Sequence, residues 1–277
     1  GANSVDLQTV RNADDQVASG EYDVISGGRN NKTDEVAPGQ NYNSNTIGGG
    51  EDNTIVAGAS ATIGGGQGNM LSTRAGVIGG GSYNEVYAGW QNSIFSGQNN
   101  YIGAGPDDDA GEGNYIASGY YNTIGFQLGE QYITYNSICG GGSDNWIDAG
   151  NYNTLGGGLG NKITKTVSTS SKRPSYNTMM GGGYNEIYDG DYNTILGGKY
   201  NVIRSNYSLV FGNNGEALND GAVLFADSST DAFQDVAANS FNIQASGGLR
   251  LVDGNEGVNK VLTCDANGTG HWADVLG

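Results

Sequence analysis

The chain has 277 residues, of which 50 are Gly and only 3 are Pro, and its formal net charge is −17. A Gly share near one in five without a Gly-X-Y period excludes collagen, and 17 Tyr with many Ile and Val argue against a disordered linker. The acidic charge argues against nucleic-acid binding, and no apolar run approaches the roughly 18 residues of a membrane span, so we expect no membrane insertion.

Residues 1–20 are predicted to form an N-terminal lead-in segment, because a regular repeat begins only after them. From 21 to 219, Asn-x-Ile or a close variant recurs with an 8-residue period in uninterrupted stretches. Side chains two apart on a strand face the same way, so Asn and Ile point to one side. We expect the asparagines to form a structural ladder inside the fold: Asn45, Asn53, Asn84, Asn92, Asn145, Asn153, Asn185 and Asn193.

Triple glycines mark one kind of corner between strands. They begin at Gly48, Gly64 and Gly79, so this corner recurs at close to twice the 8-residue period, once for every two strands. Glycine reaches positive φ without steric cost, as a tight corner requires. The sequence therefore predicts an all-β parallel β-solenoid, a β-roll with about 16 residues and two strands per coil. A roll this thin leaves large tyrosine side chains on its outside. Association of three rolls side by side would bury them, so a side-by-side homotrimer is favoured.

The repeat is interrupted near 32–44, 103–113, 125–135 and 164–176, where we expect insertions that form loops on the outside of the roll. The second insertion contains clustered carboxylates that could bind Ca²⁺ through oxygen ligands, although their spacing matches no EF-hand loop. A solvated acidic turn is the alternative. The candidate metal ligands are Asp107, Asp108, Asp109 and Glu112.

Two of the insertions hold side chains suited to saccharides. The third combines aromatic rings, which stack on the C–H faces of sugars, with amides that bind hydroxyl groups. Packing of the same rings within a trimer is the alternative. The fourth contains the only basic patch, which could meet an anionic glycan or be a solvated loop. The candidate glycan-binding residues are Phe126, Gln131, Tyr132, Tyr135, Lys172 and Arg173.

Residues 220–277 lose the 8-residue period and are predicted to form a C-terminal β cap that connects the roll to a stalk. Strands are expected at Val223–Phe225 and Phe241–Gln244.

Several stretches resemble repeats of a known kind. Residues 22–31, Tyr-Asp-Val-Ile-Ser-Gly-Gly-Arg-Asn-Asn, and 206–214, Asn-Tyr-Ser-Leu-Val-Phe-Gly-Asn-Asn, are similar to the head repeats of trimeric autotransporter adhesins of the YadA type and to related repeats in bacteriophage tail fibres. Residues 5–20 and 260–272 resemble the segments that lead into and follow such repeats. The resemblance covers nearly the whole chain. It implies a left-handed β-roll, three chains side by side, and adhesion or host recognition.

The residue types available for catalysis are few. His271 is the only histidine, which removes Ser-His-Asp and Cys-His catalysis within one chain, and Cys139 and Cys264 make no disulfide framework. We therefore expect no enzyme and no cofactor, apart from the Ca²⁺ considered above. Carboxylate-only glycoside cleavage would need a pair such as Glu85 with Glu186, or Asp144 with Asp148.

The sequence thus predicts an extracellular fibre module, of a virion tail fibre or a cell-surface adhesin, that displays loops for recognition. Its expected partners are two further copies of the chain, other fibre or tail proteins, and a host-surface glycan or receptor. Three alternatives remain. They are a ligand-free spacer shaft, a polysaccharide-degrading spike, and an ice-binding solenoid whose outward Thr row is broken by residues such as Glu85 and Tyr101.

Overall fold

The computed structural model describes residues 1–34, 44–56, 58–103, 111–125, 133–148, 150–165, 174–252 and 254–275. Within these ranges the secondary structure is all β, as predicted, and no helix is long and apolar enough to cross a membrane. The chain divides into two compact units, Gly1–Gln244 and Ala245–Gly277.

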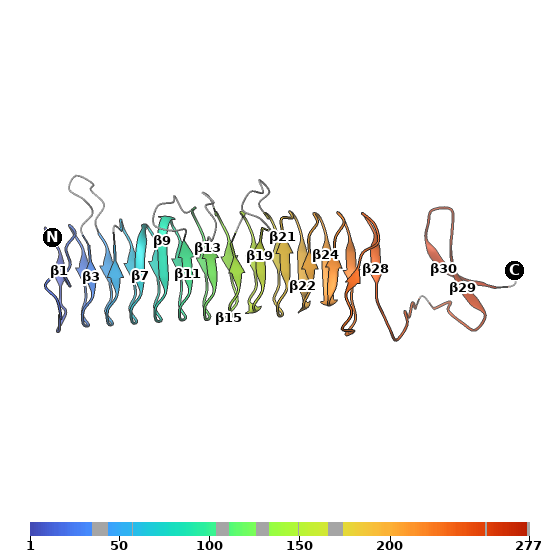
Figure 1. Ribbon diagram of the computed structural model, residues 1–277, viewed down its shortest axis with the longest axis horizontal. Coiled ribbons are helices and arrows are strands. Elements are labelled where there is room, and N and C mark those ends of the chain that lie inside the picture. The colour runs from blue at the N-terminus through green and yellow to red at the C-terminus, as the bar shows by residue number, and fades with distance from the viewer. Residues whose placement is uncertain are drawn as a thin grey trace. The chain divides into compact units, whose positions relative to one another are not determined.

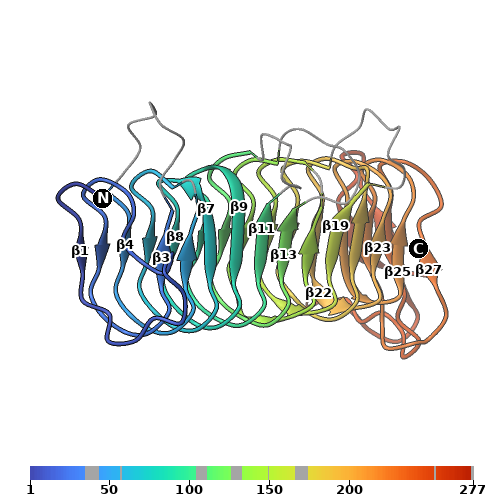
Figure 2. The same cartoon turned by 60° about the vertical axis from the view of Figure 1, so that its left-hand side comes forward.

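The first unit is a β-solenoid made of two long parallel sheets (Figures 1 and 2). Sheet A has 14 strands: β1 (Val5–Asp6), β2 (Val24–Ile25), β4 (Thr46–Ile47), β6 (Thr62–Ile63), β8 (Val77–Ile78), β10 (Ser93–Ile94), β12 (Tyr115–Ile116), β14 (Ser137–Ile138), β17 (Thr154–Leu155), β20 (Thr178–Met179), β22 (Thr194–Lys199), β24 (Leu209–Asn213), β26 (Val223–Phe225) and β28 (Phe241–Ile243). Sheet B has 12 strands: β3 (Lys32–Thr33), β5 (Thr54–Ile55), β7 (Met70–Arg74), β9 (Glu85–Trp90), β11 (Tyr101–Gly103), β13 (Thr123–Gly125), β16 (Trp146–Ile147), β19 (Lys162–Thr164), β21 (Glu186–Tyr188), β23 (Val202–Ile203), β25 (Gly215–Ala217) and β27 (Phe233–Gln234).

The chain alternates between the two sheets, so it turns two different corners in each coil. We call the corner from sheet A to sheet B the glycine corner; there the short strands β15 (Gly142–Ser143) and β18 (Gly158–Leu159) also pair. We call the corner from sheet B back to sheet A the return corner. The glycine corner needs glycine because coils approach closely there: Gly66 has φ +98°, and a Cβ on it would lie 2.1 Å from the carbonyl oxygen of Gly81 in the next coil.

Parallel pairing sets like residues above one another. Thr46 pairs with Thr62 and Ile47 with Ile63, so the offset between these coils is twice the 8-residue period. The offset is longer where the repeat is interrupted, as between the paired residues Lys162 and Glu186. The register is nevertheless kept, because the extra residues lie outside the strands.

The core is two facing columns of aliphatic side chains, one from each sheet. Ile47, Ile63 and Ile78 of sheet A are fully buried, and so are Ile55 and Leu71 of sheet B. Most strands therefore contribute one inward apolar side chain, whose burial stabilises the fold by about 1.5–3 kcal/mol before entropy is counted.

The parallel sheets extend beyond the expected repeat domain at both ends. Val5 of the lead-in segment pairs with Val24 in sheet A, so residues before 21 belong to the first coil. At the other end Val223 pairs with Phe241, and the first unit ends only at Gln244 rather than at 219. The 8-residue period fades earlier because these last coils carry Ser208 and Gly215 where earlier coils carry Asn.

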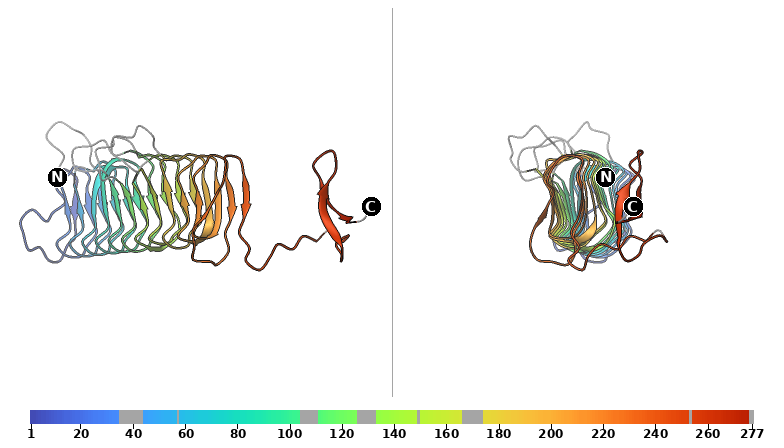
Figure 3. Two further views of the ribbon diagram at one scale, coloured as in Figure 1. Left: turned by 45° about the vertical axis from the view of Figure 1, so that its right-hand side comes forward. Right: turned by 90° about the vertical axis from the view of Figure 1, so that its right-hand side faces the viewer.

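The second unit contains one antiparallel hairpin, β29 (Lys260–Cys264) with β30 (Gly270–Asp274), visible in Figure 3. Most of its side chains are exposed, including Val261 and Leu262.

Candidate functional site

The buried asparagines form hydrogen-bond ladders beside both sheets, unbroken from Asn31 to Asn201 beside sheet B and interrupted at Ala61 and Gly76 beside sheet A. Asn185 is typical: the Oδ1 of Asn161 in the preceding coil accepts its backbone N–H at 3.0 Å and its Nδ2 at 3.1 Å. The same Nδ2 also lies 3.1 Å from the carbonyl oxygens of Gly181 and Gly198, which it can reach as a donor. All eight asparagines named from the sequence are fully buried. They hold the corners together and are buried, so the candidate site residues are to be sought among the outward side chains.

The residue before each ladder position adopts a left-handed backbone conformation. In ten places it is a tyrosine, which is unusual for a residue with a bulky Cβ substituent. The ring then leans along the roll onto the neighbouring coil. A Cβ on Gly160, for example, would lie 2.8 Å from the ring of Tyr184, so that ring covers the glycine of the preceding coil.

Five of these tyrosines stack in an unbroken row along the return corner, and we call this row the tyrosine ladder. Its ring centroids are 5.2, 5.0, 4.9 and 5.2 Å apart, and neighbouring planes differ by 14° or less. The rings remain 46–67% exposed. The members are Tyr135, Tyr152, Tyr176, Tyr192 and Tyr207.

Tyr135, a candidate glycan-binding residue, is the first member of the ladder. Its hydroxyl donates a 2.8 Å hydrogen bond to Glu112, a candidate metal ligand. This hydrogen bond raises the pKa of the Tyr135 hydroxyl. The structure thus joins two residues that the sequence assigned to separate functions. The remaining candidates lie outside the described residues: Asp107, Asp108, Asp109, Phe126, Gln131, Tyr132, Lys172 and Arg173.

All four interruptions of the repeat fall at the return corner. Each lies between a sheet B strand and the next sheet A strand: β3 and β4, β11 and β12, β13 and β14, and β19 and β20. The described residues that flank them therefore lie on the same edge of the roll as the tyrosine ladder. Within the described part of the chain, no group of three or more His, Cys, Asp or Glu residues could hold a metal ion.

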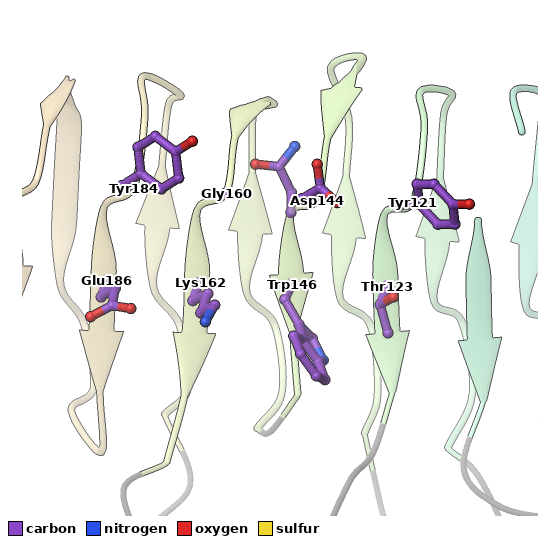
Figure 4. A pocket seen from close by; sticks show the side chains of 9 residues that line it. Tyr121, Thr123, Asp144, Trp146, Gly160, Lys162, Tyr184 and Glu186 are labelled. Carbon is purple, nitrogen blue, oxygen red and sulfur yellow. The ribbon is translucent and has the colours of Figure 1, made fainter. Parts of the chain in front are cut away.

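A groove of about 410 Å³ opens on the outer face of sheet B, beside the glycine corner. Figure 4 shows its lining in two rows along neighbouring strands. One row comes from the left-handed positions, and the other from the outward positions of β13, β16, β19 and β21. The lining residues are Tyr121, Asp144, Gly160 and Tyr184 in the first row, Thr123, Trp146, Lys162 and Glu186 in the second, and Asn145 between them.

Some polar groups of the groove already form hydrogen bonds within the chain, and others do not. Tyr188, next to Glu186 on the same face, donates a hydrogen bond to the Glu186 carboxylate. Burial of the Tyr188 hydroxyl, and to a smaller extent its hydrogen bond with Glu186, raises the pKa of Tyr188 to about 12. Among the described residues, by contrast, neither the Asp144 carboxylate nor the Lys162 amine has a hydrogen bond or an ion pair. Those two groups are available to a ligand.

The carboxylate pairs considered for glycoside cleavage do not assemble. Glu85 and Glu186 lie in the same sheet but five strand spacings apart, about 24 Å, whereas such pairs need about 5–9.5 Å. Asp148 lies on the far side of Trp146 from Asp144, and its Oδ2 accepts a 2.6 Å hydrogen bond from Thr164. Burial raises the pKa of Asp148, which that hydrogen bond partly offsets.

The outward threonines divide between the two faces. Glu85, Tyr101 and Glu186, which interrupt a single Thr row when the sequence is read alone, belong to sheet B. On sheet A the register gives a separate row of small residues interrupted at Val77 and Tyr115: Thr46, Thr62, Ser93, Ser137, Thr154, Thr178 and Thr194.

The last strands of sheet A, β24, β26 and β28, carry an exposed apolar surface, which we call the phenylalanine column. Phe211, Phe225 and Ile243 are paired in register and are 46%, 37% and 40% exposed. Met180 and Leu196, also exposed, lead into it along the same face. Large apolar residues aligned in this way mark an interaction surface more often than isolated ones do.

No family model matches the chain, and no curated protein matches it. The groove was not anticipated from the sequence, although Tyr121, Asp144 and Tyr184 each directly precede an Asn of the ladder, which is the signal that places them in one row.

Proposed function

We propose that the chain is a fibre module that acts outside the cell, in a tail fibre or a surface adhesin, and recognises a host-surface glycan or receptor along its side. One observation carries this proposal. The tyrosine ladder keeps large aromatic side chains exposed on the same edge where all four interruptions of the repeat occur. The interior is filled by its Ile columns and Asn ladders, so the core does not require these rings. No catalytic role is proposed.

The recognition proposal is tested by presenting the purified chain to a printed panel of neutral, N-acetylated and acidic oligosaccharides and to whole cells. The variant Tyr152→Ala with Tyr176→Ala should reduce binding at least about tenfold, because it removes two adjacent rings, each worth roughly 1 kcal/mol of contact. Tyr22→Ala is the matched control, since Tyr22 has the same backbone conformation and is exposed outside the ladder. Equal binding by both variants would contradict a role for the ladder.

We further propose that the module is a side-by-side homotrimer of left-handed rolls, as the resemblance implies, with about 16 residues in each uninterrupted coil. The phenylalanine column supports the lateral contact. Its successive residues lie one coil apart, so the column of a second copy, which has the same spacing, can pack against it residue by residue. Burying several such side chains would contribute about 1.5–3 kcal/mol each before association costs.

Light scattering behind a sizing column tests the assembly. A mass near three times 28.6 kDa is expected for the whole chain. Phe211→Ser with Phe225→Ser should shift it toward 28.6 kDa, whereas Val77→Ser, exposed on the same sheet but outside the column, should leave it unchanged. A monomeric wild-type chain would overturn the trimer and leave the recognition proposal standing.

A second candidate function is ice binding by sheet A. The observation in its favour is the row of Thr and Ser that remains once the sheet B residues are set apart. Val77 and Tyr115 interrupt the row. Thermal hysteresis of the purified chain measures this function directly, and its absence would exclude it.

A further inference from the structure

We propose that the groove on sheet B is a second binding site, separate from the tyrosine ladder, and that it takes a short neutral oligosaccharide lying along the roll. The groove is beside the glycine corner and the ladder is along the return corner, so the two sites share no residue. The proposal therefore does not depend on the fibre function, and either can fail alone.

The groove exists because two small residues lie between two large ones in one row. Along the left-handed positions of four successive coils the order is Tyr121, Asp144, Gly160 and Tyr184. Gly160 has no side chain to fill its place, and the Tyr184 ring leans over it from the next coil. Together with the short Asp144 side chain, this leaves a hollow between the two tyrosine residues that Figure 4 shows at the ends of the row.

Three aromatic side chains line this hollow and are held in place by their neighbours. The Trp146 indole N–H donates a 3.3 Å hydrogen bond to the carbonyl oxygen of Gly125. The Tyr184 ring stacks on that of Tyr200, with centroids 5.5 Å apart and an 18° angle between planes. Rings fixed in this way lose little conformational entropy when a ligand arrives, which favours affinity at a shallow site.

The polar groups stand where a sugar placed against the rings would present its hydroxyls. The Asp144 carboxylate can accept hydrogen bonds and the Lys162 amine can donate them, since neither forms a hydrogen bond or a short ion pair with the residues that the structure describes. Glu186, oriented by Tyr188, supplies a second acceptor. Aromatic faces for C–H groups, mixed with charged acceptors and a donor for hydroxyls, match the alternating surface of a pyranose better than that of a lipid or an apolar peptide.

The local charge selects among saccharides. Two carboxylates and one amine line the groove, so the site is net negative, and the chain as a whole carries −17. A sialylated, sulfated or uronic-acid ligand would meet repulsion from both sources. A neutral hexose or N-acetylhexosamine oligomer would not. The volume of about 410 Å³ lies toward the lower end of ligand sites, which fits a few sugar rings rather than a long chain.

Intrinsic fluorescence gives a direct test, since the chain has 3 Trp. In the Trp90→Phe, Trp272→Phe background Trp146 becomes the sole indole reporter. This protein is titrated with chito-, cello- and malto-oligosaccharides and, in parallel, with sialyllactose and hyaluronan fragments. We expect a saturable change in Trp146 emission with at least one neutral series, at about millimolar affinity, and none with the acidic ligands.

Substitutions in the otherwise wild-type chain then show which residues bind the saccharide, with binding measured by saturation-transfer NMR. Trp146→Ala and Lys162→Met should each weaken it at least about fivefold, whereas Trp146→Phe, which keeps a ring, should weaken it less. Tyr22→Ala, exposed and outside both the groove and the tyrosine ladder, is the control and should leave it unchanged. An unchanged melting temperature for Trp146→Phe guards against misfolding. Binding of no neutral saccharide, a preference for acidic ones, or binding indifferent to both groove substitutions would each overturn the proposal.

Discussion

Replacing Asn69 with alanine probes the force that holds successive coils together. Asn69 lies in the middle of the sheet B ladder and is fully buried. Its Nδ2 donates to Asn53 Oδ1 at 2.9 Å and can also reach the carbonyl oxygen of Gly65 at 3.1 Å and that of Gly81 at 3.0 Å. Its Oδ1 accepts the backbone N–H and the Nδ2 of Asn84, both at 3.1 Å. One side chain thus joins three coils.

The cost of Asn69→Ala follows from which groups keep a partner. The Asn84 Nδ2 can still donate to Gly80 and Gly97, and the Gly81 carbonyl still accepts from Gln67. The buried Asn84 N–H loses its acceptor, which costs about 1–3 kcal/mol, and two further hydrogen bonds are lost at about 1 kcal/mol each. We therefore expect a destabilisation of about 3–5 kcal/mol, at the high end for a single substitution.

Urea unfolding followed by circular dichroism measures the total, and amide hydrogen exchange at Asn84 measures the local opening. The matched control is Gln67→Ala, an exposed side chain in the same coil, for which we expect a change within about 0.5 kcal/mol. If Asn69→Ala cost no more than Gln67→Ala, or if exchange at Asn84 were not accelerated, the ladder would not be what holds the coils together.

Three further predictions test other parts of the fold. Gly66→Ala should destabilise by more than about 3 kcal/mol, whereas Gly80→Ala, whose Cβ would meet nothing within 4 Å and whose backbone is not left-handed, should cost under about 1 kcal/mol; thermal melts compare them. Tyr176→Ala should cost about 1–3 kcal/mol, since it removes two stacking contacts, and calorimetry measures it; a neutral effect would contradict stabilisation by stacking. Burial raises the pKa of Asp148 above its ordinary 3.8, so the folded chain binds the extra proton and stability falls as pH rises through that window. Asp148→Asn should therefore raise the melting temperature at neutral pH and lose this gain below 3.8, and a gain that persists in acid would refute the cause.

The spacing of Asn and Ile was enough to predict the scaffold, because every coil must solve the same two problems in the same way. In most strands an Ile or another aliphatic residue fills a core only one side chain deep, and at most corners an Asn satisfies backbone groups that water cannot reach. The faces were harder to predict. Thr54 and Thr62 stand one 8-residue period apart and look equivalent in sequence, yet they lie on opposite sheets, so a single outward Thr row was the wrong description.

The groove escaped prediction for a different physical reason. Its residues come from coils of unequal length, because the steps from Tyr121 to Asp144 and from Gly160 to Tyr184 are longer than the step from Asp144 to Gly160. A fixed period cannot bring them into one column, because extra residues at the return corner change the count without changing the strand register.

A short motif that the backbone of the corner requires does align these residues. The Gly-x-x-Asn at 119–122, 142–145, 158–161 and 182–185 holds the tight glycine corner in every one of these coils, and in each the residue just before the Asn is the one that lines the groove. Because the corner and the lining depend on different positions of the same motif, the lining residue can differ from coil to coil while the corner keeps its form. That independence is what would let one scaffold carry different binding surfaces.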